Sequence, residues 1–160
     1  MGVYTSVDPA TGDRNAQYGE ITDAELDDLV GRSTTAYRSW RTAPLERRRA
    51  VLTRAAVIHR EQADELAKLL TLEMGKPIAQ ARGEVELVAS FYQYYADHVD
   101  DFMADEPLDI TGSGTAVVRT EPIGPLVRIM PWNYPYYQVA RLAAPNIALG
   151  NTIIVKHARN

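Results

Sequence analysis

Apolar positions in the first part of the chain recur every three or four residues, which is the spacing of an amphipathic helix. Thr22 followed by Glu25 forms a capping box, which predicts the start of the first helix. Later helices are predicted to begin at Pro44, near Gln62 and at Ile78. Gly75-Lys76-Pro77 separates the last two helices, and the final one is expected to continue to Met103 because its apolar spacing persists.

Two stretches rich in turn-forming residues lie outside the predicted helices. Residues 7–13 predict a short hairpin or an extended edge near the start of the chain. Gly112-Ser113-Gly114 forms a second turn, and residues 115–121 after it favour a strand. We therefore predict an exposed strand pair within residues 109–124, which would need covering because unpaired strand edges associate readily.

The last part of the chain predicts a strand, a helix and a second strand. The apolar run 125–130 is short enough for one buried strand. Helix-like spacing then continues to Gly150-Asn151, and the β-branched residues 152–155 predict the second strand. This order is typical of a βαβ unit with parallel strands. Ligands of such sheets bind beyond the carboxyl ends of the strands, where Asn133 and Lys156 fall.

Several motifs in the chain carry a resemblance to a known family. Pro131-Trp132-Asn133-Tyr134-Pro135, together with Val155-Lys156, resembles the NAD(P)-dependent aldehyde dehydrogenases. Upstream, the stretch 71–77 (TLEMGKP) and Glu84-Val85 also resemble that family, most closely its succinate-semialdehyde dehydrogenase branch. The resemblance extends from about residue 8 to the last residue and covers only the amino-terminal part of a family member.

The resemblance implies an α/β fold, namely part of the aldehyde dehydrogenase fold. Residues 1–108 would form the helical part of the cofactor domain. Residues 109–124 would form a hairpin arm that pairs with a partner subunit, and residues 125–160 the first βαβ unit of a parallel, Rossmann-like sheet. The intact protein would then be a homo-oligomer.

The resemblance also implies oxidation of an aldehyde to a carboxylic acid with NAD or NADP, with succinate semialdehyde as the candidate substrate. In that family a cysteine thiolate attacks the aldehyde carbonyl, a hydride leaves to the nicotinamide, and water hydrolyses the thioester. Asn133 matches the side chain that donates a hydrogen bond to the developing oxyanion. An amide suits this role because it donates without carrying a charge. The alternative is that Asn133 caps the following helix, where Asn is favoured.

Further residues match cofactor and substrate positions of the family. The cofactor groove would be lined by Ile129, Met130, Pro131 and Trp132. Lys156 would hydrogen-bond the adenosine ribose, although a lysine at a strand end is usually just solvated. Tyr134 and Tyr137 match positions near the aldehyde tunnel, with packing in the core as the alternative for both.

The residues after Lys156 depart from the common pattern of the family. His157, Ala158 and Arg159 stand where many members have Pro, Ala and Glu. The acidic residue usually holds the ribose hydroxyls, and it would repel a 2′-phosphate. Arg159 removes that repulsion and adds attraction, so we expect a preference for NADP over NAD.

Composition narrows the remaining classes of function. The net charge of −4 gives no reason to expect nucleic acid or an anionic membrane as a partner. No apolar run approaches the ~18 residues of a membrane helix, and the chain opens without a secretory leader, so we expect a cytoplasmic protein. His59 and His98 are expected to be structural or solvated rather than metal ligands, and residues 47–49 to form a solvated arginine face.

The 160 residues contain no cysteine. They also lack the family's glycine-containing turn under the pyrophosphate and its general-base glutamate. We therefore predict that this chain alone neither closes a cofactor site nor oxidises aldehydes, because the thiolate nucleophile is missing. Two other interpretations stay open. One is a non-catalytic interaction module that pairs with a full-length relative, and the other is a simple nucleotide-binding module, which the missing turn disfavours.

Overall fold

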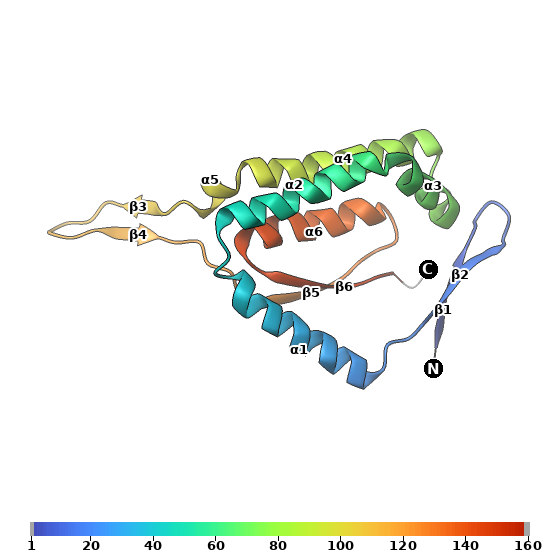
Figure 1. Ribbon diagram of the computed structural model, residues 1–160, viewed down its shortest axis with the longest axis horizontal. Coiled ribbons are helices and arrows are strands. Elements are labelled where there is room, and N and C mark those ends of the chain that lie inside the picture. The colour runs from blue at the N-terminus through green and yellow to red at the C-terminus, as the bar shows by residue number, and fades with distance from the viewer. Residues whose placement is uncertain (1, 159–160) are drawn as a thin grey trace.

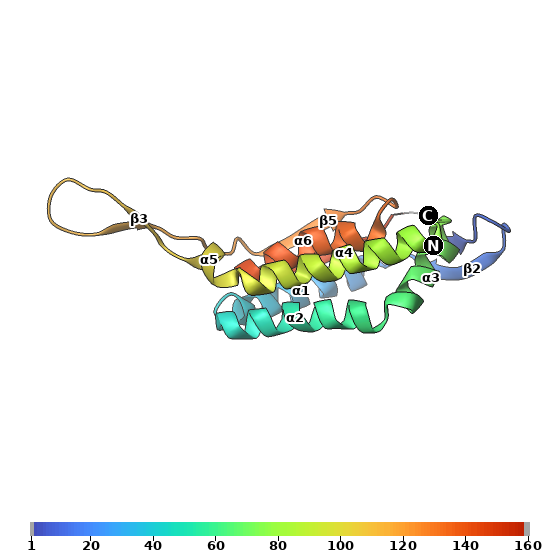
Figure 2. The ribbon, with the colours of Figure 1, turned by 90° about the horizontal axis from the view of Figure 1, so that it is seen from above.

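The computed structural model describes residues 2–158 as an α/β arrangement in layers (Figure 1). Helix α1 (Asp23–Trp40) packs on the sheet formed by β5 (Pro125–Ile129) and β6 (Thr152–Lys156). Helix α6 (Pro135–Leu149) lies on the other side of that sheet, and a helical layer covers α6 (Figures 1 and 2). The helical layer consists of α2 (Leu45–Glu61), α3 (Ala63–Met74), α4 (Ile78–Asp97) and α5 (Val99–Met103).

The ends of the helices follow the local signals in the sequence. The capping box of α1 is confirmed, since the Glu25 amide donates to Thr22 Oγ1 at 3.2 Å and the Thr22 amide to Glu25 Oε2 at 2.8 Å. The predicted single helix from residue 78 to residue 103 is wrong at His98, where φ of −110° and ψ of 11° leave the helical range. The chain then starts α5, and Val99 directly after the break is fully buried in the core.

Two antiparallel hairpins extend from the layered body. The first, predicted over residues 7–13, is confirmed as a pairing of β1 (Val3–Val7) with β2 (Arg14–Gly19). The second pairs β3 (Glu106–Leu108) with β4 (Ala116–Val118) and projects away from the body (Figure 2). Its first strand thus lies before residue 109, the predicted start of the arm. Pro107 obscured this strand, because proline is disfavoured inside sheets and tolerated only at edges.

The predicted βαβ unit is present. Strands β5 and β6 are parallel, with Ile129 opposite Lys156. The prediction of a buried first strand is wrong for one face of β5, because Val127 is 66% and Ile129 75% exposed. Burial of a strand face depends on what covers it, and in residues 2–158 these two side chains face outward.

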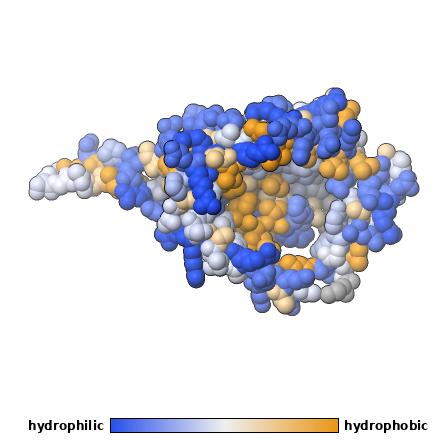
Figure 3. All heavy atoms as spheres, in the orientation of Figure 1, coloured by the Kyte–Doolittle hydropathy of each residue, from blue (hydrophilic) through white to orange (hydrophobic). Residues whose placement is uncertain are grey.

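The main core lies between α6 and the helical layer. Its buried residues come mostly from three helices: Leu52, Ala56, Val88, Tyr92, Ala96, Ala140, Ala143, Ala144 and Ala148. Alanines dominate the contributing face of α6, which lets this helix approach its neighbours closely. More apolar surface is gathered in the recess between α1 and the helical layer (Figure 3). Nowhere in residues 2–158 does a helix combine the length and apolar character needed to cross a membrane.

One arginine of the run 47–49 corrects the prediction of a solvated face. Arg48 is only 3% exposed, and it donates from Nη1 to the Ala148 carbonyl at 3.1 Å and from Nη2 to the Arg41 carbonyl at 2.9 Å. Its charge therefore lies at the carboxyl end of α6, where the helix macrodipole favours a cation. Gly150 follows with φ of 97°, a left-handed conformation that favours glycine, and a Cβ there would also approach Arg48 Nη2 to 2.9 Å.

Candidate active site

The loop between β5 and α6 carries most of the predicted site residues. Its first residue, Met130, is 4% exposed, and its amide donates to the Lys156 carbonyl at 2.9 Å. Pro131, Trp132 and Asn133 after it are exposed. Tyr134 then has φ of 58° and ψ of 52°, and it is the one non-glycine with positive φ among the described residues. A left-handed tyrosine costs on the order of 1 kcal/mol and persists only where its surroundings impose it.

The structure argues against the capping alternative for Asn133. The N-cap of α6 is Tyr134 rather than Asn133, and no N-cap side chain bonds to the helix. Pro135 occupies the first turn, where its missing amide hydrogen is not needed. Asn133 is therefore exposed directly before the left-handed Tyr134, and its side-chain amide does not cap the helix.

Glu84 provides the cap that the loop lacks. This residue of α4 is 1% exposed, and its Oε1 accepts from the Tyr136 amide at 3.0 Å and the Tyr137 amide at 3.2 Å. Its Oε2 accepts from Nζ of Lys76, which is also buried at 6% exposure. No role at the site is predicted from the sequence for Lys76 or Glu84. Glu84 lies beside Val85 on the buried face of α4, and a carboxylate at such a position is a signal that it has a specific partner.

The carboxyl ends of the two parallel strands bring the expected cofactor residues to one edge. Lys156 is exposed at the end of β6, and its Nζ lies 5.5 Å from the centre of the Tyr4 ring. Ile129 faces it in register at the end of β5, and Trp132 is 55% exposed on the loop beyond. Asn133 and Lys156 thus extend from the same sheet edge. Arg159, the residue on which the NADP preference depends, lies outside the described residues.

The two tyrosines expected near the aldehyde differ in their surroundings. Their rings are in contact, with centroids 5.9 Å apart and nearly perpendicular. Tyr134 is 44% exposed, whereas Tyr137 packs against the main core and places its ring 5.7 Å from that of Phe91. The core alternative therefore describes Tyr137 in part, while Tyr134 remains accessible beside Asn133.

Between these tyrosines, Tyr136 offers a test at high pH. Burial, followed by the nearby Glu73 and Glu84 carboxylates, raises the pKa of Tyr136 from 10.0 to about 12. Because the folded value is the higher one, its contribution to stability is complete below pH 10 and is lost as the pH rises towards 12. We expect the free energy of unfolding to fall over that interval, and Tyr136→Phe to reduce the fall. Urea denaturation at a series of pH values measures it, and an equal fall in both proteins would contradict the assignment.

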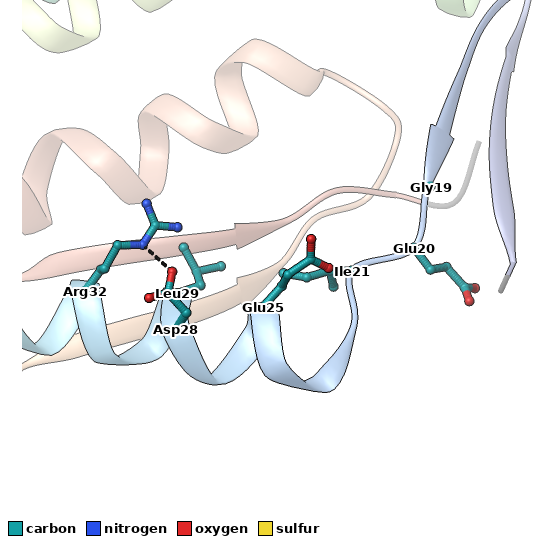
Figure 4. Close-up of a pocket in the computed structure, with 7 residues that line it drawn as sticks. All are labelled: Gly19, Glu20, Ile21, Glu25, Asp28, Leu29 and Arg32. Carbon is teal, nitrogen blue, oxygen red and sulfur yellow. Dashed lines mark ion pairs between the residues drawn. The ribbon is translucent and has the colours of Figure 1, made fainter.

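The surface hollow drawn in Figure 4 lies elsewhere, between the end of β2 and α1. It is lined by Gly19, Glu20, Ile21, Glu25, Asp28, Leu29 and Arg32. Arg32 and Asp28, one turn apart on α1, form an exposed ion pair of 2.8 Å on the helix side of the hollow. None of the predicted site residues lines this hollow, which is therefore separate from the sheet edge that carries Asn133 and Lys156.

Comparison with known proteins identifies relatives along the whole chain. The model of the aldehyde dehydrogenase family matches residues 2–160. The chain is similar to the NADP(+) succinate-semialdehyde dehydrogenase of Deinococcus radiodurans, with 42% identity over 155 residues, which are 97% of this chain and 32% of that protein. The corresponding Mycobacterium avium protein is 36% identical over 158 residues, with 97% of this chain and 34% of the relative covered.

Solved structures give the same result. Succinic semialdehyde dehydrogenase from Streptococcus pyogenes, in complex with NADP+, aligns with a TM-score of 0.93 and 38% identity over 98% of this chain and 34% of that one. The Burkholderia pseudomallei succinate-semialdehyde dehydrogenase aligns with a TM-score of 0.91 and 34% identity over 98% of this chain and 33% of that one. The chain therefore spans about a third of the length of the relatives it matches.

Proposed function

Because the chain belongs to the aldehyde dehydrogenase family, we propose that it supplies the oxyanion donor and one edge of the cofactor site to an enzyme that oxidises succinate semialdehyde with NADP. The observation that carries the proposal is the position of Asn133. It is exposed at the carboxyl edge of a parallel sheet, and its side-chain amide does not cap α6. Ligands of parallel sheets bind at this edge.

The residues at this edge fit a dinucleotide. Lys156 is exposed at the end of β6 and can donate hydrogen bonds to ribose hydroxyls. Ile129 and Trp132 offer exposed apolar surface beside it. A nicotinamide bound at this edge would supply the hydride acceptor for the oxidation. The choice of NADP is supported by Arg159, which takes the place of a carboxylate that would repel a 2′-phosphate, and by the NADP relatives.

The role of Asn133 is to stabilise charge on the aldehyde oxygen. When a nucleophile adds to the carbonyl, that oxygen becomes an anion, and a donor fixed in place beforehand lowers the barrier. The backbone around Asn133 is held by the Met130 bond to Lys156 and by the left-handed Tyr134. The nucleophile itself has to come from other sequence, because the 160 residues contain no cysteine.

The proposal is tested with what we call the joined enzyme. It consists of these 160 residues followed by the part of the Deinococcus radiodurans relative that lies beyond its matched segment. We expect the joined enzyme to form NADPH from NADP+ and succinate semialdehyde, and to work less well with NAD+. The 160-residue chain alone should give no rate above background, because it lacks a thiol. A folded but inactive joined enzyme would refute the proposal.

A second candidate function, pairing with a full-length relative, is favoured by the projecting β3–β4 hairpin. Leu108, Val117 and Val118 on this hairpin are 47–49% exposed, which is unusual for a short strand pair that stays uncovered. The chain would then act as an interaction module. Co-purification of the chain with the intact relative, lost when Val117 and Val118 are both replaced by lysine, would support this role.

A further inference from the structure

A buried ion pair contacts the loop that carries Asn133. The side chains of Lys76 and Glu84 are 6% and 0% exposed. Burying two charges costs several kcal/mol per ion, and apolar residues of similar volume often serve stability equally well. Stability alone therefore does not account for this pair, and its contacts indicate a more specific role.

The carboxylate of the pair replaces the missing helix cap. Tyr134 has no side-chain bond to the helix it precedes, and Pro135 has no amide hydrogen. The amides of Tyr136 and Tyr137 are the first available donors, and both point at Glu84 Oε1, at 3.0 and 3.2 Å. A buried negative charge here also matches the positive end of the α6 macrodipole.

The ammonium of the pair holds the residue on the other side of Pro135. Lys76 Nζ lies 3.4 Å from the centre of the Tyr134 ring, which is a close cation–π contact. The backbone of Lys76 is itself fixed. Its carbonyl accepts a hydrogen bond from Thr71 Oγ1 at 2.8 Å, and the residue comes directly after Gly75, the left-handed C-cap of α3. The ion pair therefore contacts the loop both through the Tyr134 ring and through the first amides of α6.

We propose that Glu84 is a positioning residue, which works with Lys76 to hold Tyr134 in its left-handed conformation and thereby directs the Asn133 amide. This inference rests on the proposed role of Asn133 as oxyanion donor. Glu84 does not touch the reacting atoms in this scheme. It acts through the backbone of residues 134–137, which continues directly from Asn133.

The first test is Glu84→Gln in the joined enzyme. The amide keeps the size of the side chain but removes the charge that binds Lys76, so the loop loosens. Since a misplacement of about 1 Å can cost ~10²-fold in rate, we expect kcat to fall about 10–100-fold while KM for NADP+ changes little. The matched control is Glu86→Gln on the same helix, where the exposed carboxylate pairs with Arg60 at 3.4 Å and kcat should stay the same.

A double-mutant cycle separates positioning from a structural role. If Glu84 acts through Asn133, then Glu84→Gln should lower kcat by less than about twofold once Asn133 is alanine, because coupled residues are not additive. An equal loss in both backgrounds would overturn the inference. If Asn133→Ala alone leaves kcat unchanged, the proposed role of Asn133 is wrong, and the cap is then judged by the next measurement.

The variant Lys76→Met/Glu84→Met guards against a failure to fold, because it replaces the pair by apolar side chains of similar size. In the 160-residue chain, amide hydrogen exchange at Tyr136 and Tyr137 should become about tenfold faster, since each amide loses its partner. Exchange at Ala140 and Ala143, further along α6, should change little. Unchanged exchange at the two tyrosines, or loss of protection along the whole helix, would overturn the proposed cap.

Discussion

Asn133→Ala in the joined enzyme is expected to lower kcat for succinate semialdehyde about 10²–10³-fold, the usual effect of removing one oxyanion donor. The side chain is exposed and does not cap α6, so its removal should leave the fold intact. KM for NADP+ should change little, because the amide acts on the substrate oxygen. Initial rates of NADPH formation at saturating substrate measure the effect.

The matched control is Gln80→Ala, which removes an exposed side-chain amide from α4. This variant should keep the kcat of the unmodified joined enzyme. Asn133→Asp adds a second comparison, because it preserves the shape of the side chain but replaces the donor by an anion that repels the oxyanion. It should be at least as slow as Asn133→Ala. If Asn133→Ala keeps more than about half of kcat, Asn133 is not the oxyanion donor.

Leu52→Ala is expected to destabilise the chain by about 2–5 kcal/mol, the range for removing a buried leucine without refilling its space. Leu52 of α2 is fully buried in the main core, where small alanines of α6 face it. Alanines cannot extend into the space left behind, so the cavity should persist. The midpoint of urea denaturation, with the slope unchanged, reports the loss.

Leu69→Ala is the control for this substitution. Leu69 of α3 is 47% exposed, and the same chemical change there should alter the free energy of unfolding by only about 0.5 kcal/mol. A similar loss for both variants would mean that the main core does not carry the stability of the fold.

Much of the fold follows from short-range patterns in the sequence. The capping box at Thr22, the helix stop at Gly150 and the β-branched residues 152–155 each act within a few residues, and the elements they predict are present. The βαβ order, and with it the common edge for Asn133 and Lys156, follows from these signals alone.

The features that could not be predicted depend on partners far away in the chain. Glu84 accepts hydrogen bonds from amides more than fifty residues later, and Arg48 donates to a carbonyl one hundred residues later. In the sequence both appear as ordinary charged positions on helices. The exposure of Val127 likewise depends on what covers β5, which no pattern within the strand encodes.

The N-cap of α6 lies one residue later than residue type favours, because the capping acceptor comes from a distant part of the chain. Asn favours the N-cap and tolerates left-handed conformations better than Tyr, so the sequence favours Asn133 over Tyr134 for both. The structure instead gives both roles to Tyr134 and supplies the capping acceptor from Glu84. A rule based on residue type fails here because the acceptor comes from another helix.

Helix α6 is bound at its two ends by opposite buried charges, the Glu84 carboxylate on its first amides and the Arg48 guanidinium on the Ala148 carbonyl. Neither contact uses a side chain of α6, so its outer surface can vary in sequence without loosening them. Sliding the helix along its axis by one turn, about 5.4 Å, would break both contacts together. The two contacts therefore fix the position of α6 along its axis, and with it the distance by which Asn133 extends beyond the sheet edge.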